Sequence, residues 1–178
     1  GTLAGTAVAP VVNGQATFSG LSIDKAGLGY TLQAASSSFA PVTSAPFDIT
    51  AGPAVVLVFT STPGNTRVNN VFLSQPVLEA RDAYGNRATS FTGAVALAIK
   101  SGTGTAGAAL SGTTTINAAN GLASFSGLSI NRIGTGYQLT ATASGLPTVD
   151  STNFDITANA LVFTLQPVST VAGQNLLV

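Results

Sequence analysis

The chain has 178 residues, of which 7% are charged, and its six basic and six acidic side chains cancel. A typical soluble domain carries about 25% charged residues, so this surface lacks the field that attracts nucleic acid or an anionic membrane. His, Cys, Met and Trp are absent, which excludes disulfides and any catalytic site built on a histidine or a cysteine. No apolar run reaches the ~20 residues of a membrane helix, so we expect neither a nucleic-acid partner nor membrane insertion.

The sequence contains a long internal repeat. Residues 1–51 align without a gap onto residues 108–158, and 25 of the 51 pairs are identical, most densely in Gly14–Ile23 against Gly121–Ile130. The offset of 107 residues is the length of a small domain and is too long for a solenoid repeat. We therefore predict three units: the C-terminal half of a domain at 1–52, a complete domain at 53–158, and the opening strands of a further domain at 159–178.

Most segments of the predicted complete domain alternate apolar and polar residues between Gly, Asn, Pro or Ser, as strands do. In chain order the predicted strands are Val55–Ser61, which is apolar on both faces, one or two strands within Val71–Asp82, Gly93–Ile99, Thr113–Ile116, Leu122–Phe125, Tyr137–Thr142 and Phe154–Thr157. The Asp82–Asn86 segment after the second run is expected to turn, because its Gly-Asn pair suits positive φ. About seven strands in about 100 residues predict an all-β fold of tandem immunoglobulin-like (Ig-like) Greek-key β-sandwiches.

Two tyrosines support this fold. Tyr30 and Tyr137 both occur in the pattern Gly-Tyr-x-Leu-x-Ala after a Gly-rich corner. Ig-like sandwiches place a tyrosine near the start of the penultimate strand, and its hydroxyl bonds back to the nearby backbone. We predict this structural role for both residues, with contact to a ligand as the alternative.

Four segments of the chain resemble a known family. They are Asp82–Asn86 after a strand, Phe91–Val95, Ser101–Gly104 and Gly121–Ile130. Together they resemble the bacterial Ig-like (Big-type) tandem repeats of large cell-surface proteins, which include invasin- and intimin-type adhesins and related repeat proteins. The resemblance implies an Ig-like domain in an extracellular protein of the bacterial surface. Intimin-type proteins end in a lectin-like tip domain, and nothing in this sequence resembles one.

The acidic residues do not form a convincing catalytic pair. The complete domain offers Glu79, Asp82, Asp150 and Asp155. Glu79 and Asp82 stand at an odd spacing in one strand and so face opposite ways, and Asp155, like Asp48, points outward between an inward Phe and Ile. Glycoside hydrolysis needs two carboxyl groups that converge, so we expect no enzyme and no catalytic residues.

Calcium binding is the cofactor question that the residues raise. Asp82 with the carbonyls of the 82–86 turn is the only dense candidate. The favoured interpretation is that this carboxylate caps the amides of its own turn. We therefore predict no metal site and no cofactor-binding residues.

Three other features have structural explanations. An isopeptide crosslink needs a buried Lys beside Asn or Asp, but Lys25 becomes Arg132 in the second copy and nothing supports Lys100. The Gly-rich Ser101–Gly107 lacks the following Lys and helix of a phosphate-binding loop. The loop aromatics that could present a platform for sugars are expected to pack beneath loops instead; they are Phe39, which becomes Leu146 in the second copy, and Phe91.

The partial units allow two explanations. The sequence can be a fragment of a longer tandem array of domains. Alternatively, residues 161–178 of one subunit can complete the half-domain of the next subunit, as in donor-strand fibres. Such complementation would omit the equivalents of residues 75–107, which include two central strands, so the first explanation is favoured.

These features predict a structural segment of a long extracellular bacterial repeat protein that forms or extends a surface fibre, sheath or stalk. Its expected partners are copies of itself, because the Ala- and Thr-rich outer faces permit close lateral packing. One alternative is an adhesin or glycan-binding module that contacts a glycan or a host-cell surface. Another is an accessory domain of a secreted hydrolase.

Overall fold

The computed structural model describes residues 1–160 and 171–174 of the chain. Its regular elements are all β-strands, and these residues include no helix of the length and apolarity that a membrane crossing requires. The predicted opening strands at 159–178, and the less favoured pairing of residues 161–178 with a neighbouring subunit, fall almost entirely outside the described residues.

Residues 1–52 form short strands that pair two by two. In chain order they are β1 (Leu3–Ala4), β2 (Val11–Val12), β3 (Gln15–Ala16), β4 (Ser22–Ile23), β5 (Gly27–Tyr30), β6 (Gln33–Ala34), β7 (Val42–Thr43) and β8 (Phe47–Ile49). β1 pairs with β4, β2 with β3, β5 with β8 and β6 with β7, all antiparallel. Isolated two-stranded ribbons are marginal in water, so this unit lacks the sheets that would stabilise it.

Residues 53–158 form a more extensive structure. The strands are β9 (Val56–Ser61), β10 (Thr66–Arg67), β11 (Val77–Arg81), β12 (Ala94–Ile99), β13 (Leu110–Ser111), β14 (Thr115–Asn117), β15 (Leu122–Ser124), β16 (Ser129–Ile130), β17 (Gly134–Tyr137), β18 (Leu139–Ala143), β19 (Val149–Asp150) and β20 (Phe154–Thr157). One sheet has the order β15-β11-β9, and another has the order β14-β12-β18-β19. In a third ladder β20 lies between β17 and β10 and runs parallel to β10.

One hydrophobic core joins these sheets. Its buried side chains come from both main sheets, from β16, β17 and β20, and from connections between strands; they include Leu57, Phe72, Leu78, Ala80, Val95, Leu97, Leu128, Ile130, Tyr137, Leu139, Ala141, Phe154 and Ile156. The ring of Phe154 lies edge-on to Phe72 with centroids 5.4 Å apart and stacks on Tyr137 at 6.0 Å. Two sheets that share one core are consistent with a β-sandwich.

Most of the predicted strands are confirmed. β9 and β12 begin one residue later than predicted, and along β12 Val95 and Leu97 are buried while Ala94 and Ala98 are exposed. The predicted run from Tyr137 to Thr142 is two strands, because the chain leaves the ladder of β17 and enters that of β18. The two-residue strands β10, β13, β16 and β19 were not predicted, since a pair of residues shows no alternation.

Of the one or two strands predicted within Val71–Asp82, the structure has one, β11. Residues before Val77 form a bent connection instead. Pro76 has no N–H to give a ladder, and the side-chain amide of Gln75 donates to the carbonyl of Phe72 at 2.9 Å. Phe72 is nevertheless buried, so this connection anchors the core without being a strand.

A bulge recurs at the same place in both copies. On β17 the register shifts between Gly134 and Tyr137, and the N–H of Gly136 donates to the Asp155 carboxylate at 2.8 Å. In the first copy the N–H of Gly29 donates to Asp48 at the same distance. Gly136 and Gly29 have φ of 68° and 70°, a region that favours glycine. Asp48 and Asp155 thus each accept a hydrogen bond from a glycine N–H of the bulge and stabilise it.

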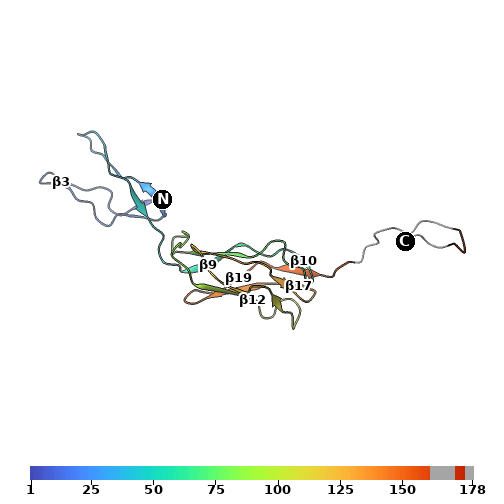
Figure 1. Cartoon of the computed structure of the whole chain (residues 1–178). Helices are drawn as coiled ribbons and strands as arrows, with labels where there is room; N and C mark the ends of the chain where they lie inside the picture. The colour runs from blue at the N-terminus through green and yellow to red at the C-terminus, as the bar shows by residue number, and fades with distance from the viewer. Residues whose placement is uncertain (161–170, 175–178) are drawn as a thin grey trace.

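The two units follow one another end to end. In Figure 1 residues 1–50 lie beyond the end of the larger unit where β9 begins, and the chain leaves β20 at the opposite end. The backbone passes from the first unit to the second once, through the linker that contains Gly52. The turn after β11 lies at this crossing, since it hydrogen-bonds to both Gly52 and residues 24–26.

Candidate functional site

The predicted turn at Asp82–Asn86 is the most densely bonded polar site of the described residues. Asp82 directly follows β11 and is 5% exposed. Its backbone N–H donates to the carbonyl of Asn86 at 2.9 Å, and Gly85 has φ of 79°, so the chain reverses here. Burial of a carboxylate requires compensating donors, and four N–H groups supply them.

These donors come from the turn and from the linker. Asp82 Oδ1 accepts from the backbone N–H groups of Tyr84 and Asn86, both at 2.9 Å. Asp82 Oδ2 accepts from Gly52 N at 2.9 Å and from Asn86 Nδ2 at 3.0 Å. The prediction that Asp82 caps the amides of its turn is confirmed, and the carboxylate also binds a backbone amide outside that turn.

The same bonds control the ionisation of the site. The Asn86 side-chain amide, followed by the backbone amides of Gly52, Asn86 and Tyr84, lowers the pKa of Asp82 from 3.8 to about 2 against the opposing effect of burial. Each amide directs its partial positive charge at the carboxylate and so favours the charged form. The site therefore carries a fixed negative charge that neutral dipoles satisfy.

Asn86 extends the network onto the preceding unit. Its Nδ2 donates to the carbonyl of Asp24 at 2.9 Å, and its Oδ1 accepts from the backbone N–H of Ala26 at 3.1 Å. Beside it, Lys25 Nζ donates to the carbonyl of Tyr84 at 2.9 Å. We call Asp82–Asn86, Gly52 and the 24–26 turn the junction. The role of Asn86 was not predictable from the sequence, because its partners lie about 60 residues away and form no motif.

An apolar hollow adjoins the junction. It measures about 350 Å³ and is lined on one side by Ile23 and Ile49 of the first unit and on the other by Val55 and Tyr84 of the second. Tyr84 is largely exposed, so the hollow opens to solvent. The junction thus combines hydrogen bonds between side chains and backbone with an apolar contact that is open to solvent.

The other predicted acidic residues are dispersed. Glu79 pairs with Arg81 of its own strand at 2.8 Å. Asp150 pairs with Lys100 at 2.7 Å and accepts from Thr140 Oγ1 at 2.6 Å; these two partners lower its pKa. Within residues 1–160 and 171–174, no three His, Cys, Asp or Glu side chains gather in a way that could hold a metal ion.

The predicted hydroxyl bonds of the two tyrosines are confirmed, although Tyr30 ends β5 and Tyr137 ends β17, where the sequence predicted that each would begin a strand. The Tyr137 hydroxyl donates to the carbonyl of Arg132 at 3.0 Å, and the Tyr30 hydroxyl donates to that of Lys25 at 3.1 Å. Each bond reaches back five residues and closes the Gly-rich corner before the strand. Lys25 and Arg132 take part through their backbone, so the exchange between them does not affect the corner.

The loop aromatics differ from one another. Phe91 packs against the core, as predicted. For Phe39 the prediction is wrong, since this side chain is 79% exposed, whereas its counterpart Leu146 packs on the core. Residues 1–52 contain no counterparts of β9, β11 and β12, so the loop that carries Phe39 has no core to pack against.

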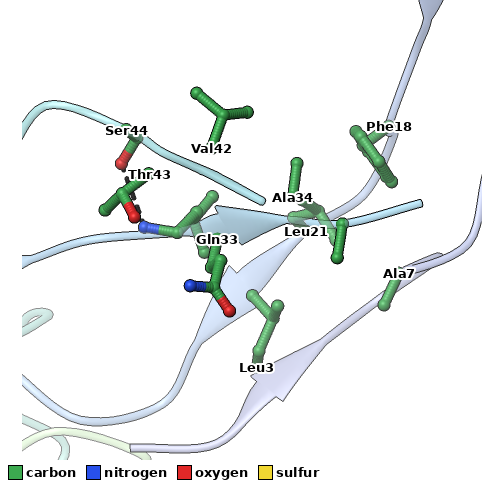
Figure 2. Close-up of a pocket in the computed structure, with 11 residues that line it drawn as sticks. Leu3, Ala7, Phe18, Leu21, Gln33, Ala34, Val42, Thr43 and Ser44 are labelled. Atoms are coloured by element: carbon green, nitrogen blue, oxygen red, sulfur yellow. Dashed lines mark hydrogen bonds between the residues drawn. The ribbon is translucent and has the colours of Figure 1, made fainter. Parts of the chain in front are cut away.

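A second hollow, of about 400 Å³, lies entirely within residues 1–52. Leu3, Phe18, Leu21, Ala34 and Val42 line it with a few polar neighbours, and Figure 2 shows these side chains around the open space between β1, β6 and the 42–44 segment. A hydrogen bond from Leu32 N to Ser44 Oγ, 2.9 Å long, fixes one wall. None of its lining residues is charged.

Comparison with known proteins gives structural similarity only. No protein-family model matches the chain, and no curated protein matches it. Among solved structures, one similar chain is a glycosyl hydrolase family 2 member from Bacteroides cellulosilyticus, with a TM-score of 0.45, 16% identity and 66% of this chain covered. Another is a β-glucuronidase from glycoside hydrolase family 2, with a TM-score of 0.46, 17% identity and 69% coverage. The matched parts span 15% and 13% of those two chains, so the likeness concerns a small portion of each enzyme.

Proposed function

We propose that this chain is a structural segment of a long extracellular bacterial repeat protein, in which tandem Ig-like domains of Big type form or extend a surface fibre, sheath or stalk. The observation that carries the proposal is the junction. One turn of the second unit holds the linker through Asp82 and the preceding unit through Asn86. A linker that is bonded to the domain it precedes restricts bending, which is the property that a stalk needs.

The strand order supports the Ig-like assignment. One sheet with the order β15-β11-β9 faces another with the order β14-β12-β18-β19, and β10 leaves β9 to run parallel with β20. Ig-like sandwiches divide about seven strands between two such sheets and have a tyrosine corner before the penultimate strand. The bonded hydroxyl of Tyr137 matches that corner.

The junction can recur along an array. In the first unit it uses main-chain groups, namely the Asp24 carbonyl and the Ala26 N–H. The second copy has Asn131, Arg132 and Ile133 at the equivalents of residues 24–26, and these exchanges leave the main-chain groups in place. Arg132 also retains the positive charge of Lys25. Each unit of this type can therefore present the same acceptor and donor to the turn of the next.

The rigidity of the junction is measurable without a background signal, because the chain has no cysteine. Leu28 is 85% exposed on β5, and Thr135 occupies the equivalent exposed position on β17. Spin labels on Leu28→Cys and Thr135→Cys should give one narrow distance distribution by pulsed electron paramagnetic resonance. Asn86→Ala should broaden it, because the side-chain bonds to residues 24 and 26 are lost.

The matched control for this measurement is Asn153→Ala. Asn153 is an exposed asparagine that directly precedes β20, outside the junction, and its removal should leave the distribution narrow. A broad distribution in the unsubstituted chain, or one that Asn86→Ala does not change, would contradict a rigid structural segment. Tight and saturable binding to one sugar in a glycan or host-cell screen would instead favour the adhesin alternative. A catalytic domain elsewhere in the same polypeptide would favour the accessory domain of a hydrolase.

A further inference from the structure

The first unit exposes an apolar face that its repeat copy buries. Phe18 is 42% exposed, whereas its counterpart Phe125 is 4% exposed. The same contrast holds for the positions that line the hollow of Figure 2: Leu128, Leu139 and Ala141 are fully buried, and their counterparts Leu21, Leu32 and Ala34 line an open space. We call this surface of residues 1–50 the open face.

The covering that the second copy has comes from three strands. β9, β11 and β12 bring side chains such as Leu57, Leu78 and Val95 into the core over residues 108–158. β11 pairs with β15, and β12 pairs with β14 and β18. Their counterparts in the first unit lack these neighbours: β3 pairs only with β2, and β6 pairs only with β7, among the described residues. Two strand edges therefore border the open face.

The backbone of the open face already has the geometry of the covered copy. Asn13 and Asn120 have the same φ of 50°. Gly5 and Gly112, at 100° and 99°, also agree, as do Gly20 and Gly127, at 66° and 68°. The pair of hydrogen bonds between Leu32 and Ser44 recurs between Leu139 and Ser151. The face thus requires little rearrangement to receive the missing strands.

The start of the unit is also in place. Thr2 N donates to Asp24 Oδ1 at 2.7 Å, and Ala109 N donates to Asn131 Oδ1 at 2.8 Å. The first residues of the two copies are therefore held by the same bond to the same position. A segment joined in front of Gly1 enters the unit where residue 107 enters the second copy.

We propose that the open face binds the N-terminal half of another repeat copy, in the position that residues 54–107 hold against residues 108–158. The occupant supplies two strands at the β3 edge and one at the β6 edge, with apolar side chains at alternate positions toward the hollow. The open face of a second chain cannot take this place, because it would bring another set of strands β1–β8 and no counterpart of β9, β11 or β12. The inference stands on the repeat and on burial, and it does not depend on the proposed function.

A chain extended by one half-repeat tests the proposal. Residues 54–107 are added in front of Gly1 of the full chain, so that Gly107 of the addition precedes Gly1 as it precedes Ala108. Hydrogen exchange of the amides of residues 1–50 should slow by on the order of a hundredfold or more, because they join a cooperative unit. Binding of a hydrophobic dye to the open face should fall in parallel.

The control is the same extended chain with Leu78→Asp and Val95→Asp in the added half only. It has the same length and connection but cannot pack its strands on the open face, so residues 1–50 should exchange as in the unextended chain. Equal exchange in the two extended chains would overturn the proposal. Protection of residues 1–50 in a dimer of the unextended chain would also overturn the proposal, since the open face would then be covered by a second, identical chain. The junction measurement uses the unextended chain, so either idea can fail alone.

Discussion

Residues 1–51 and 108–158 are closely similar peptides in two settings. The second is covered by β9, β11 and β12, and the first is not. Their bulges, tyrosine corners and positive-φ residues agree, yet within residues 1–160 and 171–174 only the second has a hydrophobic core. The comparison teaches that local hydrogen bonds and glycine positions define the path of the backbone within this segment, whereas burial depends on the strands that precede it.

The largest contrast is expected from a core phenylalanine. Phe125→Ala should destabilise the second unit by about 3–5 kcal/mol, because it removes a buried ring and leaves a cavity. Phe18→Ala should change stability far less, since its ring is already partly in water. Urea titration followed by the NMR signals of each unit measures both. Equal effects would mean that the first unit has a core of its own.

A glycine pair isolates a contact with the connection between β11 and β12, which only the second copy has. Gly14 and Gly121 have φ of 79° and 76°, so alanine costs about 1–2 kcal/mol of strain at either position. At Gly121 the new Cβ would also lie 2.6 Å from the carbonyl oxygen of Ala88, whereas at Gly14 nothing lies within 4 Å. Gly121→Ala should therefore lower the urea midpoint of its unit more than Gly14→Ala does. The reverse order would contradict the difference in covering.

A tyrosine pair tests a bond that both copies share. Tyr137→Phe should cost about 1–2 kcal/mol, because the carbonyl of Arg132 loses its donor in a buried corner. Tyr30→Phe should cost less, since water can reach the carbonyl of Lys25 in the more open first unit. Thermal unfolding of the two variants against the unsubstituted chain gives both values. A larger loss for Tyr30→Phe would show that the first corner is the less hydrated one.

Acid should loosen the junction between the two regions. The pKa of Asp82 is lowered from 3.8 to about 2 in the folded chain by Asn86 and the backbone amides. Its stabilising contribution is therefore complete above pH ~4 and is lost as the pH falls toward 2. The spin-label distribution should broaden over that range, with the largest change between pH 4 and 2. Asp82→Asn, which has no charge to lose, should remove that part of the pH dependence.

The sequence predicts the parts of this fold that repeat at short range. The alternation of Val95 and Leu97 with small outward residues identifies β12, and the Gly-Tyr-x-Leu pattern identifies the corner at Tyr137. The capping role of Asp82 also follows, because its donors include the amides of its own turn. These features need only a few consecutive residues to be recognised.

Long-range contacts were not predictable in the same way. Asn86 binds the backbone of residues 24 and 26, and backbone partners leave no trace in residue identity. Phe39 shows the other limit: its loop resembles that of Leu146, but its exposure depends on strands that are not part of the segment. The setting of a repeat, rather than its sequence, decides whether such a residue is covered.

The claim that the segment keeps one backbone geometry in both settings has a direct test. NMR backbone chemical shifts can be compared for equivalent residues of the unsubstituted chain, such as Asn13 with Asn120 and Gly29 with Gly136. Matching shifts are expected within each pair, together with much faster hydrogen exchange in residues 1–50 than in residues 108–158. Random-coil shifts throughout residues 1–50 would contradict it, because the geometry would then depend on the covering strands as the burial does.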